Sequence, residues 1–136
     1  MTTLTSGTRA DRIAALAFDY AAQPKTRVGR CNLCGTAAFV GLTHRDRYGY
    51  PASAAACATC GLVFLDPVMT PEAYGRFYVG TYRPLVSAFH GRLIDARTIQ
   101  AEQRDYAQER GDLLAPYLAD RAERTLLDIG GSTGIV

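Results

Sequence analysis

Two short stretches, Cys31-Asn32-Leu33-Cys34-Gly35 and Cys57-Ala58-Thr59-Cys60-Gly61, contain all four cysteines of the chain. In each stretch two residues separate the cysteines, so that one tight turn can direct both sulfur atoms toward a single metal ion. The glycine after each pair suits a turn whose N–H groups point inward toward the thiolates. The spacing therefore predicts a zinc ribbon whose metal ligands are Cys31, Cys34, Cys57 and Cys60.

Three other interpretations of these cysteines remain open, namely an iron atom in a rubredoxin-like site, a redox pair, and four unrelated buried thiols. The spacing is specific for a four-sulfur site, whereas the choice between zinc and iron depends on metal supply. Four protein ligands leave no coordination position for water or substrate, so the ion is expected to stabilise the fold and not to catalyse. A module of about 35 residues has too small a hydrophobic core to be stable without such an ion.

The composition favours a folded chain, because 48% of the 136 residues are hydrophobic and 21% are charged. The formal charge of +2 counts the thiols as neutral. A four-thiolate zinc site lowers it by about two, so the overall charge identifies no partner. The apolar run 13–18 is too short for a membrane-spanning helix or a signal peptide. We therefore predict a soluble cytoplasmic protein with reduced thiols and no membrane partner.

The segments around the cysteines show alternating helix and strand patterns. Apolar residues at helical spacing predict a helix over 12–22, capped by Asp11 and ended by Pro24. The short apolar runs 38–42 and 62–65 predict strands, and Asp66-Pro67 ends the second one.

The segment after the ribbon is predicted to be mainly helical. Thr70-Pro71-Glu72 is typical of a helix start, and Gly80 supplies a candidate end. An aromatic face on this helix is expected to pack on the ribbon or on the following domain. The helix-compatible stretch from about 87 to 110 is expected to be interrupted at Gly111-Asp112.

The last residues change character again. Thr125–Ile129 is a nearly continuous apolar run, as expected of a strand buried on both faces of a parallel sheet. A glycine-rich turn, Gly130-Gly131-Ser132-Thr133-Gly134, follows at once. A strand, an acidic residue and such a turn together are typical of nucleotide binding, because glycines let the backbone approach the ligand.

Leu127-Asp128-Ile129-Gly130-Gly131-Ser132-Thr133-Gly134 resembles the first motif of class I S-adenosylmethionine-dependent methyltransferases. The segment from Cys57 to Pro67, followed by Thr70-Pro-Glu-Ala-Tyr and by Phe77-Tyr78 to Tyr82-Arg83, is similar to the zinc-binding front end of one branch of that family. The resemblance covers roughly residues 28 to 136. The family's loop usually has glycine where this chain has Ser132.

The resemblance implies that S-adenosylmethionine lies against the glycine loop and that zinc occupies the ribbon. The implied cofactor-binding residues are Asp128, Gly130, Gly131, Ser132 and Gly134, with Asp128 orienting the loop. Tyr78 and Tyr82 are implied to border the same pocket. The acceptor is implied to be a sugar or another small metabolite, and no catalytic residue is identified.

These patterns together predict an α+β chain with four parts. They are a tail with a short helix at 1–27, a zinc ribbon at 28–68, a helical connector at 69–120, and the first strand of an α/β Rossmann-like methyltransferase domain at 121–136. The remaining sheet, the ribose-binding acid and any catalytic base would follow Val136. The 136 residues are therefore expected to be a fragment without methyltransferase activity of its own.

Two hypotheses compete with the enzyme interpretation. A zinc ribbon can bind nucleic acid or a protein partner, and Lys25, Arg27, Arg30, Arg45 and Arg47 supply positive charge near the cysteines. A solvated basic face is the preferred explanation of these residues, so a nucleic-acid partner is not expected. The helices at 70–118 could instead pair chains, which leaves a homo-oligomer open.

Overall fold

A computed structural model describes residues 7–118, 127, 129 and 130 of the chain. The chain divides into two compact units, Met1–Arg92 and Leu93–Val136. The first unit contains helices α1 (Arg9–Ala14), α2 (Pro71–Arg76) and α3 (Tyr82–His90), the π-helical turn η1 (Phe77–Thr81), and strands β1 (Lys25–Thr26), β2 (Phe39–Thr43), β3 (Ala54–Cys57), β4 (Val63–Leu65) and β5 (Val68–Met69). The second unit contains helix α4 (Ala96–Leu118). The predicted α+β class is confirmed.

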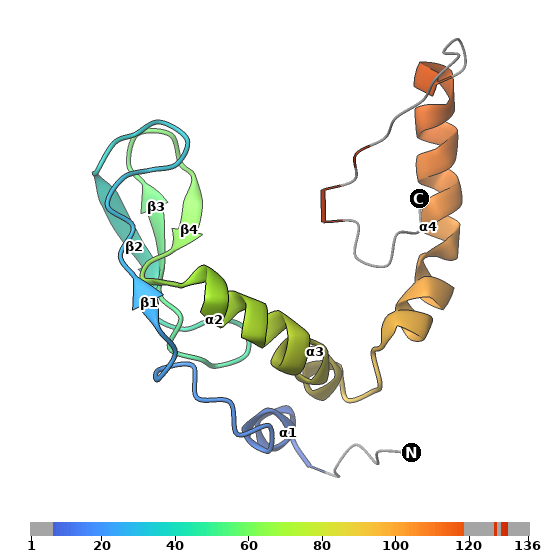
Figure 1. Cartoon of the computed structure of the whole chain (residues 1–136), viewed down its shortest axis with the longest axis horizontal. Helices are drawn as coiled ribbons and strands as arrows, with labels where there is room; N and C mark the ends of the chain where they lie inside the picture. Colours follow the sequence, from blue (N-terminus) through green and yellow to red (C-terminus); the bar gives the residue numbers. More distant parts are fainter. Residues whose placement is uncertain (1–6, 119–126, 128, 131–136) are drawn as a thin grey trace. The chain divides into compact units, whose positions relative to one another are not determined.

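The ribbon is a three-stranded antiparallel sheet in the order β2-β3-β4 (Figure 1). In this sheet Phe39 lies opposite Cys57, and Ala55 lies opposite Phe64. Strands β2 and β4 confirm the predicted runs 38–42 and 62–65. Strand β3 was not predicted, because its alanine-rich sequence has low strand propensity. Burial between its two neighbours outweighs that propensity.

A second, two-stranded sheet pairs β1 with β5 in antiparallel register, with Lys25 opposite Met69. It brings the chain before the first cysteine pair alongside the chain that leaves the ribbon. Asp66 ends β4, as predicted, and its carboxylate oxygen Oδ1 accepts a hydrogen bond from Val28 N at 3.0 Å. The segments that enter and leave the ribbon are therefore held together by backbone pairing and by this side-chain hydrogen bond.

Helix α1 differs from the prediction at both ends. Its cap is Thr8, whose hydroxyl accepts from Asp11 N at 3.2 Å while the Asp11 carboxylate accepts from Thr8 N at 2.9 Å. Asp11 is thus the third helical residue of a capping box and not the cap. The helix ends at Ala14, and Ala17 adopts a left-handed φ of 51°. This reversal separates Ile13 from Tyr20, which are buried in two different clusters.

Thr70 caps α2 as predicted, its hydroxyl accepting from Ala73 N at 3.3 Å. The predicted end at Gly80 is wrong, since the helix continues through η1 into α3 (Figure 1). Gly91 ends α3 instead, with a left-handed φ of 71°. Leu85 and Ala88 are buried against α1, and this apolar face stabilises helix beyond Gly80.

Two apolar clusters form the core of the first unit. One contains the buried residues Tyr20, Ala52, Met69 and Ala73, and the other contains Ile13, Leu85 and Ala88. Tyr50 and Phe77 pack against both clusters, so the ribbon and the helices share one continuous core. Arg12 adds a polar contact, because its Nε donates to Ala88 O at 2.9 Å near the end of α3.

Helix α4 runs without a break through Gly111, so the predicted interruption at Gly111-Asp112 is wrong. One interior glycine costs only about 1 kcal/mol, which the surrounding helix-forming residues offset. Asp95 caps the helix, with its Oδ1 accepting from Thr98 N at 2.9 Å and Asp95 N donating to Thr98 Oγ1 at 2.8 Å. None of the helices in the described part of the chain has both the length and the apolar character needed to cross a membrane.

Most of the predicted strand Thr125–Ile129 and its loop lies outside the described residues. At the described positions 127, 129 and 130 no strand is formed, and Leu127 and Ile129 are exposed. Gly130 has a left-handed φ of 85°. A Rossmann-like parallel sheet is thus not evident among the described residues.

Candidate metal centre

The two cysteine pairs fold into turns of the same geometry. In the first turn Cys31 N donates to Thr36 O at 2.8 Å and Gly35 N donates to Cys31 O at 2.9 Å. In the second turn Cys57 N donates to Leu62 O at 2.9 Å and Gly61 N donates to Cys57 O at 3.0 Å. Gly35 and Gly61 have φ values of 75° and 76°, a left-handed conformation that glycine adopts without strain. The glycine expected after each pair is therefore required by the turn.

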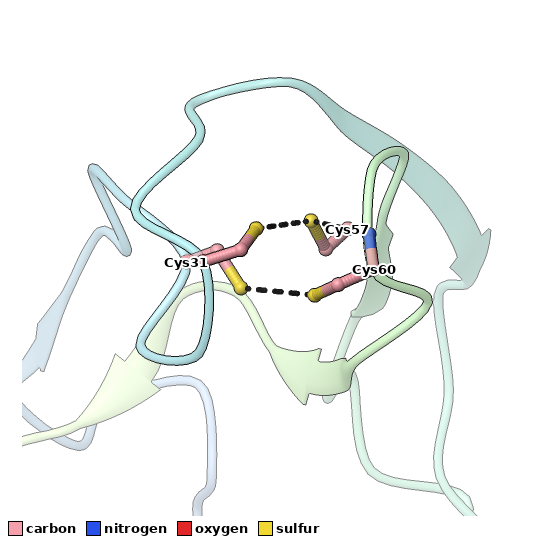
Figure 2. A group of neighbouring side chains, drawn as sticks. Cys31, Cys57 and Cys60 are labelled. Carbon is pink, nitrogen blue, oxygen red and sulfur yellow. Dashed lines mark hydrogen bonds between the residues drawn. The ribbon is translucent and has the colours of Figure 1, made fainter.

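The four sulfur atoms converge on one point. All four lie within 4.8 Å of one another, and the contacts Cys31–Cys60 and Cys34–Cys57, which join the two turns, are 3.5 Å long (Figure 2). Four sulfurs bound tetrahedrally at about 2.3 Å from zinc would lie about 3.8 Å apart. The observed separations bracket that value, and four soft sulfur donors suit zinc. The residues present therefore fit the ion.

Backbone N–H groups support the buried sulfur of each turn. Cys31 and Cys57 are 3% and 2% exposed, whereas Cys34 and Cys60 lie at the surface. Leu33 N donates to Cys31 Sγ at 3.4 Å, and Cys60 N donates to Cys57 Sγ at 3.4 Å. Such N–H groups stabilise negative charge on sulfur and orient it toward a metal.

The close approach of the thiols separates their pKa values. Burial alone raises the pKa of Cys57, but the N–H groups of Cys60 and Thr59 and the neighbouring thiols outweigh it and lower the pKa to about 6. At Cys60 the N–H of Leu62 acts to lower the pKa, yet burial and the neighbouring thiols together raise it to about 12. Four thiolates at this spacing repel one another, so a bound cation is needed for all four to be deprotonated together.

The second turn is fixed to the ribbon sheet. Ala58 N donates to Ala38 O at 2.9 Å, and Cys57 itself ends β3. The rings of Phe39 and Phe64 meet edge to face, with their centroids 4.9 Å apart. These contacts position the turn that holds two of the four sulfurs.

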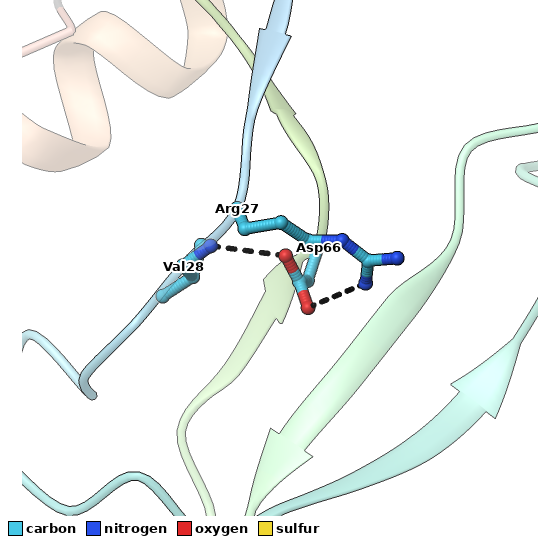
Figure 3. A network of polar contacts seen from close by, with 3 residues as sticks. All are labelled: Arg27, Val28 and Asp66. Carbon is cyan, nitrogen blue, oxygen red and sulfur yellow. Dashed lines mark hydrogen bonds and ion pairs between the residues drawn. The ribbon is translucent and has the colours of Figure 1, made fainter.

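Sequence analysis did not identify the anchoring role of Asp66. Its Oδ2 lies 3.4 Å from Arg27 NH1, in addition to its bond from Val28 N (Figure 3). The carboxylate therefore connects the end of β4 to the chain that leads into the first cysteine turn. In sequence the residue is recognisable only as part of the Asp-Pro strand end, because its partners lie 38 and 39 residues away.

The structure brings together all four predicted metal ligands. They form the one group of three or more potential ligand residues within the described part of the chain. Of the predicted cofactor-binding residues Gly130 is described, whereas Asp128, Gly131, Ser132 and Gly134 lie outside the described residues. Tyr78 and Tyr82 neighbour each other, with ring centroids 5.1 Å apart, and their predicted place beside a cofactor stays a prediction.

The basic residues near the ribbon all have intramolecular partners. Arg30 donates to Gly35 O at 3.2 Å, and Arg45 donates to Gly49 O at 2.7 Å. Arg27 pairs with Asp66, Arg47 donates to the Tyr48 hydroxyl at 2.8 Å, and the Lys25 ammonium bonds to Tyr20 O. Each of these side chains thus makes a local contact within the described part of the chain.

No protein-family model matches this chain, and no curated protein or solved structure is significantly similar to it. Its class rests on its own geometry. The first unit is a small α+β domain with antiparallel sheets and a four-cysteine cluster consistent with a zinc-binding module.

Proposed function

We propose that Cys31, Cys34, Cys57 and Cys60 bind one structural zinc ion and that this ribbon is the front end of an S-adenosylmethionine-dependent methyltransferase. The convergence of four sulfurs within 4.8 Å, two from each of two matching turns, carries the metal assignment. All four donors come from the protein, so the ion holds the two turns together and has no position for substrate. Zinc is preferred to iron because four cysteine thiolates from two Cys-x-x-Cys turns are the usual ligands of structural zinc.

Three features support the methyltransferase assignment. The segment Leu127 to Gly134 resembles the family's first motif, and the order of ribbon, helices and glycine motif is similar to that of the family's zinc-binding branch. The described Gly130 has a left-handed φ, as a tight glycine turn requires. By this resemblance the complete enzyme transfers the sulfonium methyl group to a sugar or another small metabolite.

The metal assignment is tested by purifying the chain without added zinc and measuring its metal content by mass spectrometry. One zinc per chain is expected, with no disulfide between Cys31 and Cys34. A chain with no stoichiometric metal, or with iron, would refute the zinc site.

The methyltransferase assignment is tested on the chain extended in its own reading frame through the predicted Rossmann-like domain. Calorimetric titration with S-adenosylmethionine should show one binding site, which Gly130→Val or Gly134→Val should abolish while the zinc content stays at one. Zinc binding without cofactor binding would refute the enzyme assignment and leave the ribbon intact. Salt-sensitive binding to DNA or RNA in place of the cofactor would support the nucleic-acid hypothesis.

A further inference from the structure

Strand β2 is an exposed edge of the ribbon sheet. It stands at one side of the order β2-β3-β4, and β3 is its partner strand within the described part of the chain (Figure 1). Four of its five residues are exposed. The segment 35–43 contains no charged residue and no proline, which are the residues that usually protect an exposed edge from pairing with another strand. A bulge between Gly41 and Thr43 lies near the end of the strand and leaves the part before it regular.

The ladder with β3 shows which backbone groups of β2 point to the open edge. Ala58 N donates to Ala38 O at 2.9 Å, so these two opposite residues form a hydrogen-bonded pair. In an antiparallel ladder such pairs alternate along the strand. Val40 therefore bonds to β3, whereas Phe39 and Gly41 direct their N–H and C=O groups away from it. These groups are available to a further strand.

The side chains of β2 also suit a further strand. Val40 and Val63 lie on either side of Ala56 in one row across the sheet, and they are 55% and 58% exposed. Gly41 lies inside the strand, where glycine costs stability. It has no left-handed φ, and a Cβ added there would meet no atom within 4 Å. The fold of a single chain therefore does not require glycine at this position, whereas close approach of another chain explains it.

We propose that two copies of this chain pair through β2, antiparallel and around a two-fold axis at Val40. In this register Phe39 of each copy exchanges N–H···O bonds with Gly41 of the other, which uses the backbone groups that face the open edge. Val40 packs against Val40 of the second copy. The large ring of Phe39 lies opposite the small residue Gly41, so the two strands are complementary in shape.

The charge pattern favours a second copy as the occupant of this edge. In the same register Arg45 stands opposite Gly35 of the second copy, so no like charges meet. The two ribbons then form one continuous sheet, with the exposed row through Val40 extended across both copies. A single pair of short strands makes a small interface, so the dimer is expected to be weak and to depend on concentration. The proposal goes beyond the proposed function and does not rest on it.

The test uses the full zinc-loaded chain at concentrations from micromolar to millimolar. Sedimentation equilibrium should show a dimer that grows with concentration. Amide hydrogen exchange followed by NMR should slow at Phe39 and Gly41 over the same range, because their N–H groups become bonded. The Val40 amide, already bonded to β3, is the internal control and should not change. A chain that stays monomeric throughout, or a dimer without new protection at Phe39 and Gly41, would overturn the proposal.

Two changes in β2 test the register. Val40→Lys and Val40→Glu should each weaken the dimer about tenfold or more, because each places like charges opposite one another, and mixing the two variants should restore pairing. Gly41→Pro removes an outward N–H from each copy and should weaken the dimer similarly. Proline is tolerated on an edge strand at such a position, so the variant should keep one zinc per chain.

Val63→Lys is the matched control for the Val40 variants. Val63 lies in the same exposed row, but on strand β4 at the other edge of the sheet. The change should therefore leave the dimer intact. A dimer that Val63→Lys dissociates, or one that survives both charged Val40 variants, would overturn pairing through β2. Failure of the Val40→Lys and Val40→Glu mixture to pair would overturn the two-fold register.

Discussion

Replacing Cys57 with serine removes one of the four sulfurs that converge in the ribbon. A structural zinc ion contributes about 10–16 kcal/mol to the folding of small zinc modules, so one of four equal ligands accounts for about 2.5–4 kcal/mol. That free energy corresponds to zinc affinity weaker by about two to three orders of magnitude. Cys57 is also only 2% exposed, and its sulfur accepts the N–H of Cys60. A buried serine hydroxyl there should therefore cost about 1 kcal/mol more than the loss of the ligand alone.

The exposed ligand Cys34 provides the comparison. Cys34→Ser removes a ligand at the surface, so it should weaken zinc binding similarly but destabilise the ribbon by about 1 kcal/mol less. Thr59→Ala, an exposed change within the same turn as Cys57, should leave both properties unchanged. Zinc affinity is measured by competition with a chromogenic chelator, and stability by urea unfolding with circular dichroism. A Cys57→Ser variant that keeps one zinc per chain and an unchanged urea midpoint would refute the ligand assignment.

Three further predictions concern the turns and the helices. Gly61→Ala should destabilise the ribbon by about 1–2 kcal/mol because of its φ of 76°. Gly75→Ala, in helix α2 with no atom near its added Cβ, should instead raise stability by about 1 kcal/mol. Urea midpoints equal to that of the parent would contradict both predictions. Arg12→Ala should lower the urea midpoint by an amount equivalent to about 1.5–3 kcal/mol, since the hydrogen bond from Arg12 to Ala88 O near the end of α3 is lost. An unchanged midpoint would show that this hydrogen bond is not formed in solution. The N–H of Thr98 is the largest of the interactions that lower the pKa of Asp95 in the folded protein. This cap therefore stabilises α4 fully at pH values above the pKa of the unfolded carboxyl, and the stabilisation is lost as the pH falls through the lower pKa of the folded state. Helicity measured by circular dichroism should therefore decline at acid pH more steeply in the parent than in Asp95→Asn, and identical profiles would exclude this role.

The local parts of the fold were predictable because short-range chemistry fixes them. The Thr70 cap, the strand end at Asp66 and the glycine turns each depend on residues within a few positions of one another. Errors arose where distant packing decided the outcome. Gly80 does not end its helix, because Leu85 and Ala88, further along the chain in α3, are buried against α1. The alanine-rich strand β3 forms because it lies between two partners in the sheet.

The sequence by itself identified the four candidate metal ligands, since a metal site needs donors of the right type at a spacing that one tight turn can close. Only the tertiary structure showed that the sulfurs of the two turns lie close together, and which of them are buried. It also revealed the anchoring carboxylate of Asp66, and the buried hydroxyls of Tyr20 and Tyr50, which have no partner among the described residues. These depend on contacts between residues about 30 or more positions apart, and no local pattern of side chains encodes such distances.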